Sequence, residues 1–259
     1  MPPVYLLTVA LLSTIVRLVI AFQPAVVSWR NRNPHEVLSR RHARGYTPSF
    51  SSIADAAEGT LPTGISATDP AGEGGEDARI IRQAMAWVRD VVVRLRLCPF
   101  AEGVFTTERG VRYVVTPAAN ADELWMDFLR EVDHLMAHDR EEVGTTLLMV
   151  PRCMAKLEDF NDFCAWLENT IENDEVLVDQ ILVACFHPKH AFHGLEDDDA
   201  LNYEKRSPHP TINLLRADVV DEYVAAGKTL GIAEHNERTL RSEGKGAVKA
   251  AFEDILALK

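Results

Sequence analysis

The stretch Gln180–Phe186, QILVACF, has six apolar residues in a row after its first position. A second such run, Thr145–Val150 (TTLLMV), stops at Pro151. Near-continuous apolar runs of this length are typical of strands that are covered on both faces of a sheet. Val111–Thr116 is β-branched and aromatic, so it is predicted as a third strand, with a hairpin partner at Val104–Thr107. We expect Gln180–Phe186 to be the central strand.

Helices are predicted around these strands, because apolar residues recur at steps of three and four. The first spans residues 77–97 and ends before Pro99, and the second is capped by Asn120 together with Glu123. Further helices are expected with one face formed by Leu157, Phe160, Cys164, Leu167 and Ile171, and then over residues 217–227, 231–241 and 244–258. This order predicts an α/β (or α+β) fold, with a small central sheet of three to four strands packed against helices and a helical C-terminal part.

The N-terminal segment differs from this predicted globular domain, which spans residues 77–259. Residues 1–21 have the length and apolar core of a signal peptide, with an uncleaved membrane anchor as the alternative. Residues 22–52 are rich in arginine and poor in acids, as transit peptides are, and residues 53–76 have the composition of a disordered linker. The junction before Phe22 resembles the Ala-Phe-x-Pro cleavage motif of bipartite presequences in algae with secondary plastids. We therefore expect a plastid (chloroplast) protein, with secretion as the rival interpretation.

Charge and cysteine content restrict the classes of partner. The net charge is −12, and residues 1–76 carry six basic and six acidic side chains, so the excess falls in the acidic globular domain. Such a domain repels phosphate backbones and anionic lipid, which argues against a nucleic-acid or membrane-surface partner. The cysteines Cys98, Cys153, Cys164 and Cys185 form no CxxC pair. Reduced and mostly buried thiols in a soluble domain are expected.

Five short sequence words carry a family resemblance. They are Leu97–Ala101, Thr145–Leu148, Phe186–Pro188, Asn202-Tyr203 with Arg206–Pro208, and Leu214–Arg216. In this order they resemble the uncharacterised family DUF1415, over about residues 80–242. The resemblance implies no particular activity, cofactor or catalytic residue. Two positions depart from the family pattern: His209 stands where the family usually has tyrosine, and Asn213 where it usually has histidine.

The polar segment of residues 187–210 is the predicted functional loop, because a long irregular stretch in a compact domain is often functional. His187 follows the expected central strand and is the candidate acid/base group, the alternative being a histidine that fixes the turn. Arg206 can present its guanidinium to a carboxylate or phosphate, with Ser207, Asn202 and Arg216 as further donors. The alternative for Arg206 is a structural ion pair with one of the nearby aspartates.

Two further candidates are weaker in the sequence. His187, His190 and His193, with Asp197, Asp198 and Asp199, could supply a metal site, for which His190 and Asp198 are the additional ligand candidates. Cys98 follows the C-terminal end of a predicted helix, where the helix dipole should raise the pKa of its thiol, so it is interpreted as a buried core residue and not as a nucleophile. The sequence contains no glycine-rich phosphate loop, nucleophile elbow or HExxH helix. It names no cofactor and no oligomeric state.

These observations lead to one hypothesis and two alternatives. The leading hypothesis is an enzyme of plastid metabolism that acts on a small anionic molecule, phosphorylated or carboxylated. His187 would be its acid/base group and Arg206 its anion clamp. The alternatives are a non-catalytic ligand-binding or assembly module and a metal-dependent enzyme that uses the His187 loop.

Overall fold

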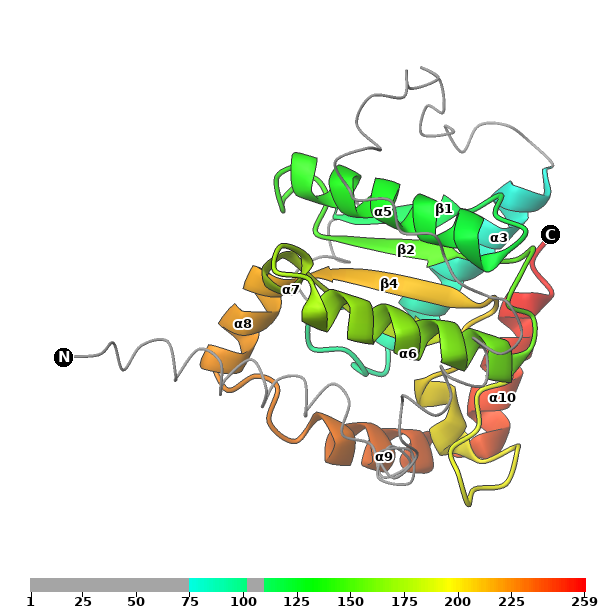
Figure 1. The fold of residues 1–259 in the computed structure, drawn as a ribbon. Helices are drawn as coiled ribbons and strands as arrows, with labels where there is room; N and C mark the ends of the chain where they lie inside the picture. The colour runs from blue at the N-terminus through cyan, green and yellow to red at the C-terminus, as the bar shows by residue number, and fades with distance from the viewer. Residues whose placement is uncertain (1–74, 102–109) are drawn as a thin grey trace.

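The computed structural model describes residues 75–101 and 110–259 (Figure 1). The predicted presequence, the linker except for its last two residues, and the hairpin strand at residues 104–107 lie outside the described residues. None of the helices in the described part of the chain combines the length and the apolar character that a membrane span requires.

A four-stranded mixed sheet forms the centre of the fold, as expected for an α/β protein. Its strands are β1 (Val111–Val115), β2 (Thr145–Met149), β3 (Ile181–Phe186) and β4 (Thr211–Arg216). They are arranged in the order β1-β2-β4-β3, where β1 and β2 are parallel and β4 is antiparallel to both of its neighbours. The three predicted strands are confirmed, and β4 is the strand that the apolar pattern did not reveal.

The structure corrects the position predicted for Gln180–Phe186. This segment forms β3 at an edge of the sheet, and β4 occupies the place beside β2. All six residues of β4 are buried, whereas four of the six in β3 are only partly buried. A run of apolar residues therefore marked a strand correctly but did not reveal which strand lies in the middle.

Helices α5 (Ala121–Ala137) and α6 (Leu157–Asn173) cover one face of the sheet and lie in front of it in Figure 1. The predicted cap is confirmed: Asn120 Oδ1 accepts from the Glu123 backbone N–H at 3.0 Å, and Glu123 accepts in return from the Asn120 side chain and the Ala119 N–H. Leu148, Val183 and Ile212 point toward this face and join the apolar stripes of the two helices. The largest apolar core thus lies between this face and α5 and α6.

The opposite face of the sheet is covered by elements from both ends of the described chain. Helix α3 (Glu76–Trp87) continues into the π-helix η2 (Val88–Val93), and both pack with α10 (Lys245–Leu256). Because side chains alternate along a strand, Leu147, Phe186 and Leu215 point toward this second face. Figure 1 shows α3 behind the sheet, on the side away from α5 and α6.

Two of the remaining helices, α8 (Ala217–Ala225) and α9 (Ile232–Glu243), confirm the helices predicted over residues 217–227 and 231–241. The short helix α7 (Leu177–Gln180) and the 3-10 helix η4 (Ala200–Glu204) in the long loop were not predicted. The first predicted helix differs in detail, since its second half is the π-helix and Arg96 after it has a positive φ of 52°. π-helical turns are rare and occur often at functional sites.

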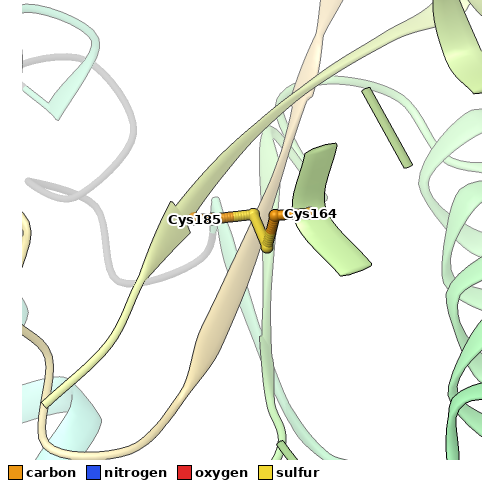
Figure 2. The surroundings of a disulfide bond; sticks show 2 residues. All are labelled: Cys164 and Cys185. Carbon is orange, nitrogen blue, oxygen red and sulfur yellow. A yellow bond between two sulfur atoms is a disulfide. The ribbon is translucent and has the colours of Figure 1, made fainter. Parts of the chain in front are cut away.

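The prediction of four reduced thiols is wrong for two of them. Cys164 on α6 and Cys185 on β3 form a disulfide, with 6.6 Å between their Cα atoms (Figure 2). Both residues lie in or against the core between the sheet and α6. The two cysteines are 21 residues apart in the sequence, and no local spacing motif predicts the bond between them. Cys98 and Cys153 are free thiols.

Candidate functional site

A cavity of about 150 Å³ lies on the sheet face opposite α5 and α6. Its floor is formed by side chains of β2, β3 and β4, namely Thr145, Leu147, Ala184, Phe186, Asn213 and Leu215. Its walls come from η2, from the Leu97–Phe100 segment, from α8 and from the start of α9. A site of this kind, largely apolar with a few polar groups, is the usual form of a small-molecule site.

Aromatic and branched side chains shape the cavity walls. Trp87 packs edge-to-face on Phe186 with 5.2 Å between ring centroids, and Phe100 lies 5.0 Å from Tyr223. The π-helix contributes Val88 and places it on the cavity side. Aromatic pairs of this geometry stabilise the packing beyond the apolar area that they bury. The walls are therefore defined by rigid groups.

None of the three charged lining residues, Glu204, Lys205 and Arg216, has an ion pair in the described ranges, and Lys205 is the one whose charged group also makes no hydrogen bond there. Its ammonium lies 5.4 Å from the centroid of the Phe186 ring. The other cation, Arg216, donates to the backbone oxygens of Val143 at 3.0 Å, His138 at 2.5 Å and Leu135. The one lining acid, Glu204, accepts from the Asn236 amide at 3.0 Å. An incoming anion would therefore meet Lys205 first.

Other polar groups of the cavity residues are buried without a partner. Among the described residues, the indole Nε1 of Trp87 and the amide Oδ1 of Asn236 find no hydrogen-bond partner, although these side chains belong to residues that are only 3% and 2% exposed. A buried polar group without a partner costs roughly 1–3 kcal/mol. Native proteins keep few such groups, so their presence around one cavity indicates a functional role for it.

Cys98 lies in the wall of this cavity, which changes its interpretation as a core residue. Burial raises the pKa of its thiol, and the backbone N–H groups of Phe100 and Ala101 and the charge of Lys205 act in the opposite direction. The predicted direction of the shift agrees with this, but its main cause is burial and not a helix dipole. The thiol is therefore largely protonated at neutral pH, next to groups that stabilise a thiolate.

His187 has structural contacts on both ring nitrogens. Its Nδ1 accepts from the Lys189 N–H at 3.1 Å, so Nε2 carries the proton and donates to the Met154 carbonyl at 3.3 Å. The side chain is 1% exposed, and burial lowers the pKa of the imidazole. These contacts match the alternative interpretation, a neutral histidine that fixes the loop.

Arg206, Asn202 and Ser207 bond within the loop itself. Arg206 donates to the His190 carbonyl at 2.8 Å and to the Asp197 carbonyl at 2.6 Å, and it stacks on the Tyr203 ring. Asn202 is fully buried, donates to the carbonyls of Glu196 and Asp197, and accepts from the Phe192 N–H. Ser207 donates to the His209 carbonyl at 2.6 Å. These side chains hold the loop in one shape.

The structure does not bring the predicted anion clamp together. Arg216 ends β4, whereas Arg206 and Ser207 precede its first residue. At about 3.3 Å per residue, the strand places Arg216 roughly 16 Å from Thr211, at the far end of β4 from the loop that holds Arg206. Asn202 and Arg206 lie together, since both donate to the Asp197 carbonyl, but both are used to hold the loop, and Arg216 does not join them.

The metal alternative gains no support from the described residues. Asp198 accepts from Lys245 at 2.7 Å on the surface, and His190 Nε2 is buried without a partner. Burial, followed by the charges of Lys205, Arg206 and His187, lowers the pKa of His190 to about 4. In residues 75–101 and 110–259, no three histidine, cysteine, aspartate or glutamate side chains lie close enough to hold an ion.

Each of the five sequence words that carry the family resemblance contributes at least one residue to the lining of the cavity. Leu97–Phe100, Thr145 with Leu147, Phe186, Tyr203, and Leu215 with Arg216 all line it. The sequence had pointed to Cys98 and Arg216, and to Asn213 only as a departure from the family pattern, but Trp87 and Lys205 were missed. The five words do mark the site. Their common location around one cavity, however, is visible only in the folded structure.

Comparison with known proteins identifies the family. The chain belongs to the family described as "Protein of unknown function (DUF1415)", which matches residues 79–250. No curated protein and no solved structure matches the chain. The match covers η2, the four strands and α9, and therefore every element that forms the cavity.

Proposed function

We propose that this DUF1415 protein binds a small, largely apolar anion in the cavity between its sheet and the elements that cover the second face. The observation that carries the proposal is the convergence of all five sequence words on one cavity next to the ammonium of Lys205, which lies over the Phe186 ring. The proposal keeps the anionic molecule expected from the sequence but moves its site from the His187 loop to the sheet face.

The size and polarity of the cavity support this class of ligand. A cavity of about 150 Å³ with apolar walls is large enough for a ring the size of benzene. Removing apolar ligand surface from water contributes roughly 25 cal/mol per Å², whereas burying an unpaired charge is strongly unfavourable. Lys205 supplies the opposite charge in a mostly apolar space, where Glu204 and Arg216 already have hydrogen-bond partners, so one anionic group on an apolar body fits best.

Benzoate and benzamide form a matched pair of probes, since they share the ring and differ in charge. We expect saturation-transfer NMR and calorimetry to show benzoate binding at least about tenfold more tightly than benzamide, the equivalent of one charge-assisted contact. Lys205→Met should abolish this preference. Lys189→Met is the control, because Lys189 is an exposed lysine of the same loop and lies outside the cavity.

Two results would overturn the proposal. One is the absence of binding by either probe to the folded wild-type protein at millimolar concentration. The other is an equal loss of benzoate binding in Lys205→Met and Lys189→Met, which would indicate a general effect of surface charge and not a contact in the cavity.

Binding and catalysis remain separable within this proposal. The ligand-binding module is favoured over the His187-dependent enzyme, because both imidazole nitrogens of His187 already contact the backbone. If turnover occurs, Cys98 and Lys205 are the groups placed to reach the ligand, whereas His187 and Arg206 are not. His187→Gln should then leave probe affinity unchanged in protein that remains folded.

The proposed place of action is the plastid, and it rests on the sequence of residues 1–76 alone. A fluorescent reporter fused after residue 76 should reach the plastid in an alga with secondary plastids. Phe22→Ala should stop it before the inner compartments, since the phenylalanine is the specific part of the cleavage-motif resemblance. Secretion of the unaltered fusion would favour the rival interpretation.

A further inference from the structure

We propose that the indole N–H of Trp87 donates a hydrogen bond to the anionic group of the ligand, next to the ammonium of Lys205. This inference rests on the proposed function and specifies the chemical class of its ligand, an anion with at least two acceptor oxygens, such as a carboxylate. Trp87 is a specificity-determining residue in this view, and it contacts the ligand without taking part in chemistry.

The indole N–H of Trp87 is a hydrogen-bond donor that the fold leaves unused. Nε1 carries the polar hydrogen of this side chain, and it can only donate. Trp87 lines the cavity, and its Nε1 finds no acceptor within the part of the chain that the structure describes. Buried indole groups usually have a partner, because a buried donor has also lost its bond to water. A ligand in the cavity can supply the missing acceptor.

Two features hold the Trp87 ring at the cavity wall. The ring packs edge-to-face on Phe186, and Trp87 is the last residue of α3, where the chain passes into the π-helix η2. π-helical turns occur often at functional sites. A donor that is already held in place loses little conformational entropy when a ligand binds to it. The Trp87 N–H is therefore prepared for a contact before the ligand arrives.

One aromatic ring brings Trp87 and Lys205 to the same part of the cavity lining. The Lys205 ammonium lies 5.4 Å from the centroid of the Phe186 ring, and the centroid of the Trp87 ring lies 5.2 Å from it. An ammonium and an indole N–H both donate, so a partner that they share must accept. A carboxylate has two oxygens and can accept from both donors at once. The two residues therefore favour a carboxylate over an anion with one oxygen.

The other unpaired group of the cavity cannot take this role. The Asn236 amide nitrogen donates to the Leu97 carbonyl and to the Glu204 carboxylate, both at 3.0 Å, so the free end of this amide is its oxygen. A carbonyl oxygen can only accept, and its partial negative charge repels an anion. Of the two unpaired groups, the Trp87 N–H is therefore the one that can bond to the anionic group of the ligand.

The direct test follows the indole N–H signals of the wild-type protein by proton–nitrogen correlation NMR during a titration with benzoate. The signal that is missing in Trp87→Phe identifies Trp87. We expect benzoate to move this proton signal downfield and to slow its exchange with water, as a new hydrogen bond does. The indole signals of Trp125 and Trp166 are the internal control and should stay in place, because these rings pack on each other at the opposite face of the sheet.

Calorimetry on Trp87→Phe measures what the hydrogen bond contributes to affinity. The phenyl ring can keep an aromatic contact with Phe186 but has no N–H. Benzoate should bind about tenfold more weakly, as the loss of one hydrogen bond to a charged group allows. Fluorobenzene, which has the ring without the anionic group, should change in affinity by less than about threefold, since apolar contacts remain. Trp125→Phe removes an indole outside the cavity and should keep both affinities.

The outcomes separate this inference from the proposed function. Benzoate binding that leaves the Trp87 signal in place would overturn the role of Trp87 and leave the cavity proposal standing. An equal loss of affinity for benzoate and fluorobenzene in Trp87→Phe would also overturn it, because the ring would then act by packing alone. Failure of benzoate itself to bind would overturn both. If Trp87→Phe does not fold, the contact with the Phe186 ring assigns the signal, so the titration remains decisive.

Discussion

The loop of residues 187–210 and the cavity on the sheet face are built in opposite ways. The loop is rich in polar side chains, and His187, Asn202 and Arg206 all bond to backbone atoms of the loop or its immediate surroundings. The cavity is mostly apolar, yet Trp87 and Asn236 hold buried polar atoms there without a partner in the described residues, and the loop residue Lys205 extends its ammonium over Phe186. The difference teaches that the abundance of polar residues is a weaker guide to a site than the polar groups that the fold leaves unpaired.

Replacing Asn202 should produce the largest effect on stability. Asn202→Leu leaves the Phe192 N–H without its partner, whereas the Glu196 and Asp197 carbonyls each lose one of two donors, which costs about 2 kcal/mol of unfolding free energy at roughly 1–3 kcal/mol for a buried unpaired group. Lys205→Met should change stability by less than about 0.5 kcal/mol, as surface-like substitutions do. Urea denaturation measures both. Equal losses of unfolding free energy in the two variants would contradict the distinction between a structural loop and a binding cavity.

Lowering the pH toward 4 should lower the free energy of unfolding, and the loop residue His190 should account for part of this loss. Burial, with help from the charges of Lys205, Arg206 and His187, holds the pKa of His190 at about 4, below its ordinary value of 6.5. The unfolded chain therefore binds a proton at a higher pH than the folded chain, so stability is fully present above pH 6.5 and falls as the pH drops toward 4. A shift of this size corresponds to at most about 3 kcal/mol.

Urea unfolding at pH 7, 5.5 and 4.5 tests this pH dependence. His190→Gln should flatten the decline, though not remove it, because burial also lowers the pKa values of His187 and His209. An unchanged slope in His190→Gln would show that other groups carry the effect.

The smallest expected effect concerns the two free thiols, whose relative rates of alkylation should differ by a few-fold. Burial raises the pKa of both, but Lys205 counteracts this at Cys98, whereas Glu123 adds to it at Cys153. Cys98 should therefore favour the anionic reagent iodoacetate over neutral iodoacetamide about fivefold more than Cys153 does, in line with about 1 kcal/mol between unit charges a few ångströms apart in water. Mass spectrometry of the alkylated peptides measures both rates.

The controls for the thiol comparison are substitutions of the two charged residues that act on the thiols. Lys205→Met should remove the preference at Cys98 and leave Cys153 unchanged. Glu123→Gln should change the reagent preference at Cys153 and leave the preference at Cys98 unchanged. A preference at Cys98 that survives in Lys205→Met would place the lysine too far from the thiol to act on it.

Much of the fold was predictable from local patterns. The Asn120 cap, the three apolar strands and the C-terminal helices each follow from signals within a few residues. Strand β4 escaped because Asn213 interrupts its apolar run and a helical pattern follows directly after Arg216. The order of strands was not predictable, because β3 and β4 are both apolar and only tertiary pairing separates edge from centre.

The site was less predictable, for physical reasons that particular residues show. Cys164 and Cys185 come together only because α6 packs on the face of β3 that carries Cys185. Arg216 looked like a ligand clamp, but its guanidinium binds the carbonyls at the end of α5, which are distant in sequence. Lys205 attracted no attention, because a lysine in a polar loop is ordinary until the structure shows it over Phe186.

The place of β4 in the sheet has a consequence for biosynthesis. β2 and β3 do not pair with each other, and β3 is joined to the β1–β2 pair only through β4, the last of the four strands to leave the ribosome. Until Arg216 has emerged, the nascent chain holds a separate β1–β2 pair and an unattached β3. Closing the sheet then requires contacts such as Thr145 with Leu215, and such distant contacts fold slowly. The strand that carries Asn213 therefore completes both the sheet and the floor of the cavity in a single late step.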